Sequence, residues 1–140
     1  MQVQAAGLTR FVESLIASGG SSAEEATIVA EHIVNANLCG HDSHGVGLLP
    51  KYVEDLGKKI LLPNRHALCV KQDGSILVYD GDLGYGQVVA REAMDAAVAH
   101  CKTQGLTLLA LRNCHHIGRV GSYGEQALAA GLISVSFVNV

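Results

Sequence analysis

The sequence predicts a mixed α/β protein, with a helical N-terminal segment followed by a β-hairpin and the start of a mixed or parallel sheet covered by helices. Three observations predict this class. Apolar residues recur at helical spacing early in the chain, an Asp-Gly pair joins two short apolar runs, and strand-length apolar runs later alternate with helical patterns. We therefore divide the chain into a helical segment over 1–66 and the first part of an α/β cofactor-binding domain over 67–140.

Two helices are expected before residue 40. The first carries a stripe of apolar side chains and is stopped by Gly19-Gly20; the stripe consists of Leu8, Phe11, Val12, Leu15 and Ile16. The spacing of Ser22 and Glu25 predicts a capping box for the second helix. Its inward stripe consists of Ala26, Val29, Ala30, Ile33 and Ala36 or Asn37.

A polar, glycine-rich turn over 40–47 separates this second helix from a short third one. Pro50 opens the third helix, which reaches Leu56. Three polar residues, His41, Ser43 and His44, are therefore expected in this turn between two helices.

The remaining elements follow in order. Runs over 67–72 and 75–79, joined by Asp73-Gly74, predict a two-residue hairpin. A long helix over 87–104 ends at Gly105, which can adopt a left-handed cap. A strand over 106–111, a helix over 122–130 and a strand over 132–138 predict a parallel βαβ unit. Because this sheet would keep an exposed apolar edge, we expect the sequence to be part of a longer protein.

Composition excludes several classes. The formal net charge is −3, from 10 basic and 13 acidic residues without long runs of one sign, which disfavours a nucleic-acid or anionic-membrane surface. The N-terminus has no signal-peptide pattern, and no stretch approaches a membrane span, so the cytoplasm is expected. Four scattered cysteines with no CxxC pair fit neither a zinc knuckle nor a disulfide framework.

The first candidate site is the segment His41-Asp42-Ser43-His44-Gly45. A histidine can donate a proton to a carbonyl oxygen as hydride arrives, and a neighbouring hydroxyl or carboxylate can hold its tautomer. The alternative is structural, because Asp and Ser side chains also cap turns by bonding backbone amides. Both interpretations stay open on these residues alone.

The second candidate is residues 112–119, Arg-Asn-Cys-His-His-Ile-Gly-Arg, between a strand and a helix. Sites of open parallel sheets form beside the carboxyl ends of strands, and helix N-termini attract phosphate. A solvated polar loop is the alternative. A zinc or iron site built from His41, His44, His115 and His116 is a further one. Neither glycine pattern, over 81–86 or 118–124, has the GxGxxG spacing of a Rossmann fingerprint.

Both candidate segments resemble one family. Residues 40–47, continuing through Leu49-Pro50-Lys51-Tyr52-Val53, and residues 112–119, continuing to Ile133, are similar to segments of the malate/L-lactate dehydrogenase-like family, which is distinct from the Rossmann-type lactate and malate dehydrogenases. The similarity covers nearly the whole chain. It implies an oxidoreductase that interconverts 2-hydroxy and 2-oxo acids with NAD or NADP, on a non-Rossmann fold, as a homodimer.

The resemblance also implies roles for single residues. His44 corresponds to the proton donor and lies on the cofactor side, Ser43 to its hydrogen-bonded partner, and His116 to a substrate-side residue. Gly118, Arg119 and Val120 correspond to the backbone stretch that approaches the dinucleotide.

The chain departs from the family in two ways. Members that act on small dicarboxylates often have an arginine where this chain has Leu48, so its motifs are closer to hydroxycarboxylate dehydrogenase B. Family members are also longer, and their later segments hold most nucleotide contacts and a further catalytic carboxylate. A catalytically incomplete fragment that acts as a binding or interaction module is therefore the rival prediction.

Overall fold

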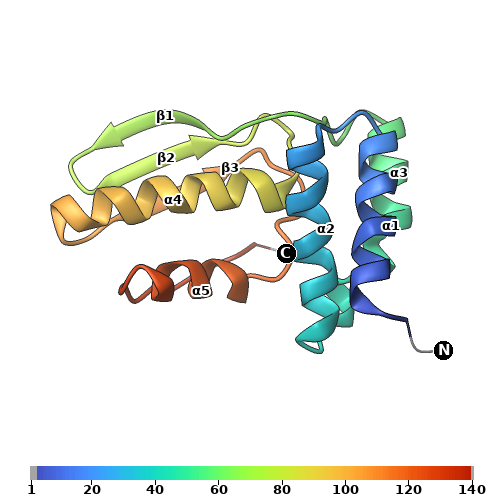
Figure 1. The fold of residues 1–140 in the computed structure, drawn as a ribbon. Helices are drawn as coiled ribbons and strands as arrows, with labels where there is room; N and C mark the ends of the chain where they lie inside the picture. The colour runs from blue at the N-terminus through green and yellow to red at the C-terminus, as the bar shows by residue number, and fades with distance from the viewer. Residues whose placement is uncertain (1–2, 140) are drawn as a thin grey trace.

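The computed structural model describes residues 3–139 and contains a three-stranded mixed sheet with three helices gathered at one end and two more running along it (Figure 1). The helices are α1 (Ala5–Ser18), α2 (Ala23–Leu38), α3 (Leu49–Gly57), α4 (Gly86–Gln104) and α5 (Gly121–Ala129). The strands are β1 (Leu68–Asp73), β2 (Ile76–Asp80) and β3 (Leu108–Arg112). The predicted mixed α/β class is confirmed. Residues 1, 2 and 140 of the two predicted segments lie outside the described residues.

The helical segment packs around α2, whose predicted inward stripe is buried. Val29, Ala30 and Ile33 have no exposed surface and meet Val12 and Ile16 of α1. Phe11 is an exception to the predicted α1 stripe, because it is 60% exposed. The core continues across the predicted boundary at residue 66, since Tyr85 and Val88 join the same cluster. The two predicted segments therefore share a core.

Only half of the predicted capping box forms at the start of α2. The Ser22 hydroxyl accepts the Glu25 backbone N–H at 3.1 Å, as expected. The Glu25 carboxylate does not return to Ser22, because it accepts the Asn64 backbone N–H at 2.9 and 3.0 Å. The side-chain oxygen of Asn64 accepts the Ser22 N–H instead. Glu25 and Ser22 therefore bind the loop that contains Asn64, which lies far along the chain.

The sheet has the order β1-β2-β3, with an antiparallel and a parallel pair. Its hairpin is predicted correctly, but the loop is Gly74-Ser75 and not Asp73-Gly74, because Asp73 pairs with Ile76. The parallel unit consists of β2, α4 and β3. In Figure 1, α4 lies between the sheet and α5.

The prediction of a strand over 132–138 is wrong for this structure. Residues 132–139 form no helix or strand, and Ile133 and Phe137 are 98% and 94% exposed. An apolar run becomes a strand only where a neighbour supplies hydrogen bonds. Among residues 3–139, no strand pairs with this one, so the predicted second parallel unit does not form.

Candidate active site

The turn after α2 is held by a side chain of α2. Two 3₁₀ turns, η1 (Asp42–His44) and η2 (Val46–Leu48), link α2 to α3. The Asn37 side-chain oxygen accepts the Val46 N–H at 2.9 Å, and its amide nitrogen donates to the Asp42 carboxylate at 2.6 Å. Gly45 leaves no room for a Cβ, because Asn37 occupies that space. Asn37 thus fixes the turn that carries His44.

Ser43 and His44 form a hydrogen-bonded pair on this turn. The Ser43 hydroxyl lies 2.9 Å from His44 Nδ1. His44 is half-buried and Ser43 is exposed. Because Nδ1 is engaged by the hydroxyl, Nε2 is the nitrogen that can exchange a proton with a substrate.

The loop after β3 is pinned against the start of α4. Asn113, at φ +53°, donates its side-chain N–H to Asp80 at 2.9 Å, and His115 donates its backbone N–H to the Gly84 carbonyl at 3.0 Å. Gly86, the first residue of α4, lies against the backbone carbonyl groups of His115 and His116. A Cβ on Gly86 would lie 2.5 Å from the His116 carbonyl carbon. The glycine permits this close approach, which sets the position of both histidines.

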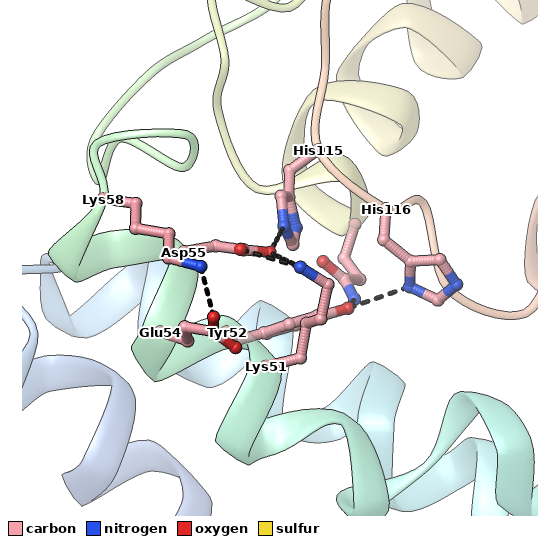
Figure 2. Close-up of polar contacts among 8 residues, drawn as sticks. Lys51, Tyr52, Glu54, Asp55, Lys58, His115 and His116 are labelled. Carbon is pink, nitrogen blue, oxygen red and sulfur yellow. Dashed lines mark hydrogen bonds and ion pairs between the residues drawn. The ribbon is translucent and has the colours of Figure 1, made fainter.

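His116 lies beside His44, although the chain separates them widely. Their ring centroids are 5.4 Å apart. The Tyr52 hydroxyl of α3 is 3.0 Å from His116 Nδ1, as Figure 2 shows, and the Gln87 amide nitrogen donates to the same hydroxyl at 2.6 Å. Desolvation, and then the neighbouring His44, lower the pKa of His116. Burial raises the pKa of Tyr52 to about 12. Both groups are therefore neutral near pH 7.

A buried carboxylate fixes the preceding histidine. Asp55 is 1% exposed, and its oxygens lie 2.8 Å from Lys51 Nζ and 2.8 Å from His115 Nε2 (Figure 2). The hydrogen bond from Lys51, followed by that from His115, lowers the pKa of Asp55. Because His115 adjoins His116 in the chain, the hydrogen bond between Asp55 and His115 ties the loop to α3 and supports the placement of His116.

The predicted cofactor stretch, residues 118–120, lies beside His32 of α2. Gly118 has φ +72°, and the His32 ring occupies the space that a Cβ would need. The Arg119 backbone N–H donates to His32 Nε2 at 3.0 Å, and its guanidinium pairs with Glu125. Burial, and then Arg119, lower the pKa of His32 to about 4. A neutral His32 is what this hydrogen bond requires, since Nε2 accepts it.

The structure thus brings Ser43, His44 and His116 together. Sequence reasoning did not assign roles to Asn37, Asp55 and Gln87, which position them. Tyr52 was also missed, although a signal existed. It lies on the inward stripe of α3, three residues after Leu49 and four before Leu56, where a hydroxyl needs a buried partner.

The four histidines of the metal hypothesis each lie beside a protein group. The nearest groups are the Cys39 carbonyl for His41, Ser43 for His44, Asp55 for His115 and Tyr52 for His116. Over residues 3–139, no three His, Cys, Asp or Glu side chains gather in a way that could hold a metal ion. In the same range, no helix has the length and apolar character needed to cross a membrane.

Comparison with known proteins identifies the family of the chain. A family model described as malate/L-lactate dehydrogenase matches residues 3–140. The chain is 44% identical, over 95% of its length, to hydroxycarboxylate dehydrogenase B of Escherichia coli strain K12, and covers 37% of that protein. It is 38% identical over all its length to an L-lactate dehydrogenase of Cupriavidus necator, and covers 40% of it.

A solved structure agrees. The structure of malate dehydrogenase from Pyrococcus horikoshii OT3 superposes with a TM-score of 0.88 at 31% identity, over 94% of this chain and 38% of that one. This chain therefore spans about two fifths of the length of the relatives it matches. The matched family model, the sequence identities and the superposition agree, and the chain belongs to the malate/L-lactate dehydrogenase family.

Proposed function

We propose that the protein is an NAD(P)-dependent oxidoreductase that interconverts 2-hydroxy acids and 2-oxo acids, with His44 as the proton donor and acceptor. The observation that carries the proposal is the meeting of the Ser43–His44 pair with His116 in a member of this family. The names of its relatives, among them hydroxycarboxylate dehydrogenase B, L-lactate dehydrogenase and 2,3-diketo-L-gulonate reductase, support the substrate class.

His44 acts through its two nitrogens. In the reducing direction the imidazolium gives its Nε2 proton to the oxygen on C2 of the substrate, while the Ser43 oxygen accepts the Nδ1 hydrogen bond. After transfer the remaining proton stays on Nδ1, where it is hydrogen-bonded to the Ser43 oxygen. Nε2 then carries no proton and can accept one in the reverse direction. The nicotinamide, when bound, supplies or takes up the hydride at C2.

His116 and Leu48 determine what the site accepts. A neutral His116 can donate a hydrogen bond from Nε2 to a substrate oxygen, because Tyr52 engages Nδ1. Leu48 packs against the core and provides no cation. We therefore propose 2-oxo acids with varied, non-anionic side chains as substrates in preference to dicarboxylates.

Residues 118–120 fit a dinucleotide through their backbone. The missing side chain of Gly118 lets the His32 ring pack against this backbone and hold it in place. The helix α5 begins next to it at Gly121, where the positive end of the helix favours phosphate. The Arg119 side chain is engaged by Glu125, so contacts would come from the main chain of Gly118 and Val120. Nothing in these residues selects NAD over NADP.

The test is turnover by the full-length protein. The assay follows the oxidation of NADH or NADPH with a panel of pyruvate-like and dicarboxylic 2-oxo acids. The pyruvate-like acids should be reduced fastest. Nucleotide binding without turnover of any such acid would contradict the proposal. It would instead favour a binding module, for which the exposed apolar side chains of Ile133 and Phe137 are the supporting observation.

The homodimeric state and the cytoplasmic location stay predictions, to be tested by light scattering and by cell fractionation.

A further inference from the structure

A chain of two hydrogen bonds runs from the start of α4 to His116. Gln87 has no exposed surface, and its amide nitrogen lies 2.6 Å from the Tyr52 hydroxyl oxygen. That hydroxyl lies 3.0 Å from His116 Nδ1. Tyr52 is itself only 1% exposed, so water has little access to the bond between Gln87 and Tyr52. Of the two amide atoms, it is the nitrogen that faces the hydroxyl.

The direction of these two hydrogen bonds decides which nitrogen of the His116 imidazole carries the proton. A tyrosine hydroxyl has one hydrogen to donate, while its oxygen can accept. Because the oxygen accepts from Gln87, the hydroxyl hydrogen needs an acceptor of its own, and His116 Nδ1 can serve as one when it carries no proton. The proton of a neutral imidazole consequently lies on Nε2. If the amide presented its oxygen instead, Tyr52 would donate to Gln87 and the proton of His116 would move to Nδ1.

We propose that Gln87, acting through Tyr52, is a positioning residue that fixes the His116 proton on Nε2, where it can be donated to a substrate oxygen. This inference rests on the proposed function of His116. The lowered pKa of His116 agrees with it, since a protonated ring would place a second donor against the Tyr52 hydroxyl. Burial of Gln87 and Tyr52 protects the hydrogen bond between these two side chains from competition with water.

The direct test is ¹⁵N NMR of histidine-labelled full-length protein, with His116 assigned by its loss in His116→Gln. The expected result is a pyridine-type Nδ1 and a pyrrole-type Nε2 resonance in the wild type. A proton on Nδ1 would overturn the proposal without any variant. Gln87→Glu, measured at a pH at which the buried carboxyl is ionised, replaces the donor by an acceptor and should move the proton of His116 to Nδ1. An unchanged tautomer in folded Gln87→Glu with that carboxyl ionised would also overturn the proposal.

Two further variants keep the test decisive if the buried glutamate prevents folding. Tyr52→Phe removes the hydroxyl and should give a mixture of the two tautomers, whereas Tyr79→Phe, the same change on β2, should leave His116 unaltered. If His116 in Tyr52→Phe keeps its proton entirely on Nε2, the proposed relay, which is the pair of hydrogen bonds from Gln87 through Tyr52 to His116, is contradicted. Tyr52→Phe should also raise KM for the 2-oxo acid about tenfold, with a smaller change in kcat. Turnover by the wild type tests the proposed function separately, because an inactive protein with His116 protonated on Nε2 would support the relay and refute that function.

Discussion

Replacing Gly86 by alanine tests whether the position of His116 depends on the close approach of α4 to the loop after β3. The new Cβ would lie 2.5 Å from the His116 carbonyl carbon, and closer to the carbonyl oxygens of His115 and His116. Carbon atoms normally stay about 3.5–4.0 Å apart, so the loop must move by about 1 Å. The obstructing atoms are backbone, and no change of side-chain rotamer can relieve the clash.

The magnitude follows from two opposing terms. Overpacking costs about 1–3 kcal/mol, and the upper half of that range applies because backbone must shift. Alanine at a helical position regains up to about 1 kcal/mol of helix propensity. We expect Gly86→Ala to lower the free energy of unfolding by about 2 kcal/mol. A shift of His116 by about 1 Å should lower kcat/KM roughly 100-fold.

Urea unfolding and steady-state kinetics of the full-length protein measure the two effects. The matched control is Gly7→Ala in α1, where a Cβ would meet nothing within 4 Å. The same chemical change should there stabilise the protein by about 0.5–1 kcal/mol and leave turnover unchanged. If Gly86→Ala is as stable and as active as Gly7→Ala, the close approach does not position His116 and the reasoning is wrong.

Three other predictions concern the frame of the site. Asn37→Ala should cost about 1–3 kcal/mol, because the Val46 N–H loses its acceptor, and should lower kcat; unaltered kcat would remove Asn37 from the support of the turn. The pKa of His32 falls from 6.5 to about 4 on folding, so the unfolded chain takes up a proton that the folded chain does not, and stability is lost as pH falls through this window. The loss, about 2 kcal/mol after allowance for partial exposure, should disappear in His32→Gln when urea midpoints at pH 7 and pH 4 are compared; parallel losses in the two proteins would contradict the assignment. Ser22→Ala removes the N-cap of α2 and should lower the free energy of unfolding by about 1 kcal/mol, and an unchanged urea midpoint would argue against that cap.

The helices and the hairpin could be predicted because their signals are local. Periodicity, the Gly19-Gly20 stop and the left-handed Gly105, at φ +79°, all act within a few residues. The strand over 132–138 could not be predicted correctly, because strand formation depends on a neighbour whose presence local sequence does not reveal. The second half of the capping box failed for the same reason, since Asn64 competes for Glu25 from far along the chain.

The site shows the same division. Ser43 and His44 are adjacent in sequence, so their hydrogen bond could be expected. Tyr52 and His116 are 64 residues apart, and their contact depends on how α3 packs against the loop after β3. The sequence contains Gln87, Tyr52 and His116, but no local pattern indicates that these three residues lie close together.

The most direct test of the central claim compares two histidines of one turn in the full-length protein. His44→Ala should lower kcat for 2-oxo acid reduction at least 100-fold, the magnitude typical of a lost general acid, with nucleotide affinity retained. His41→Ala is the control, because His41 is exposed and contacts the Cys39 carbonyl. It should leave kcat within about threefold of the wild type. Equal turnover by His44→Ala and wild type would contradict the assignment of His44 as the proton donor.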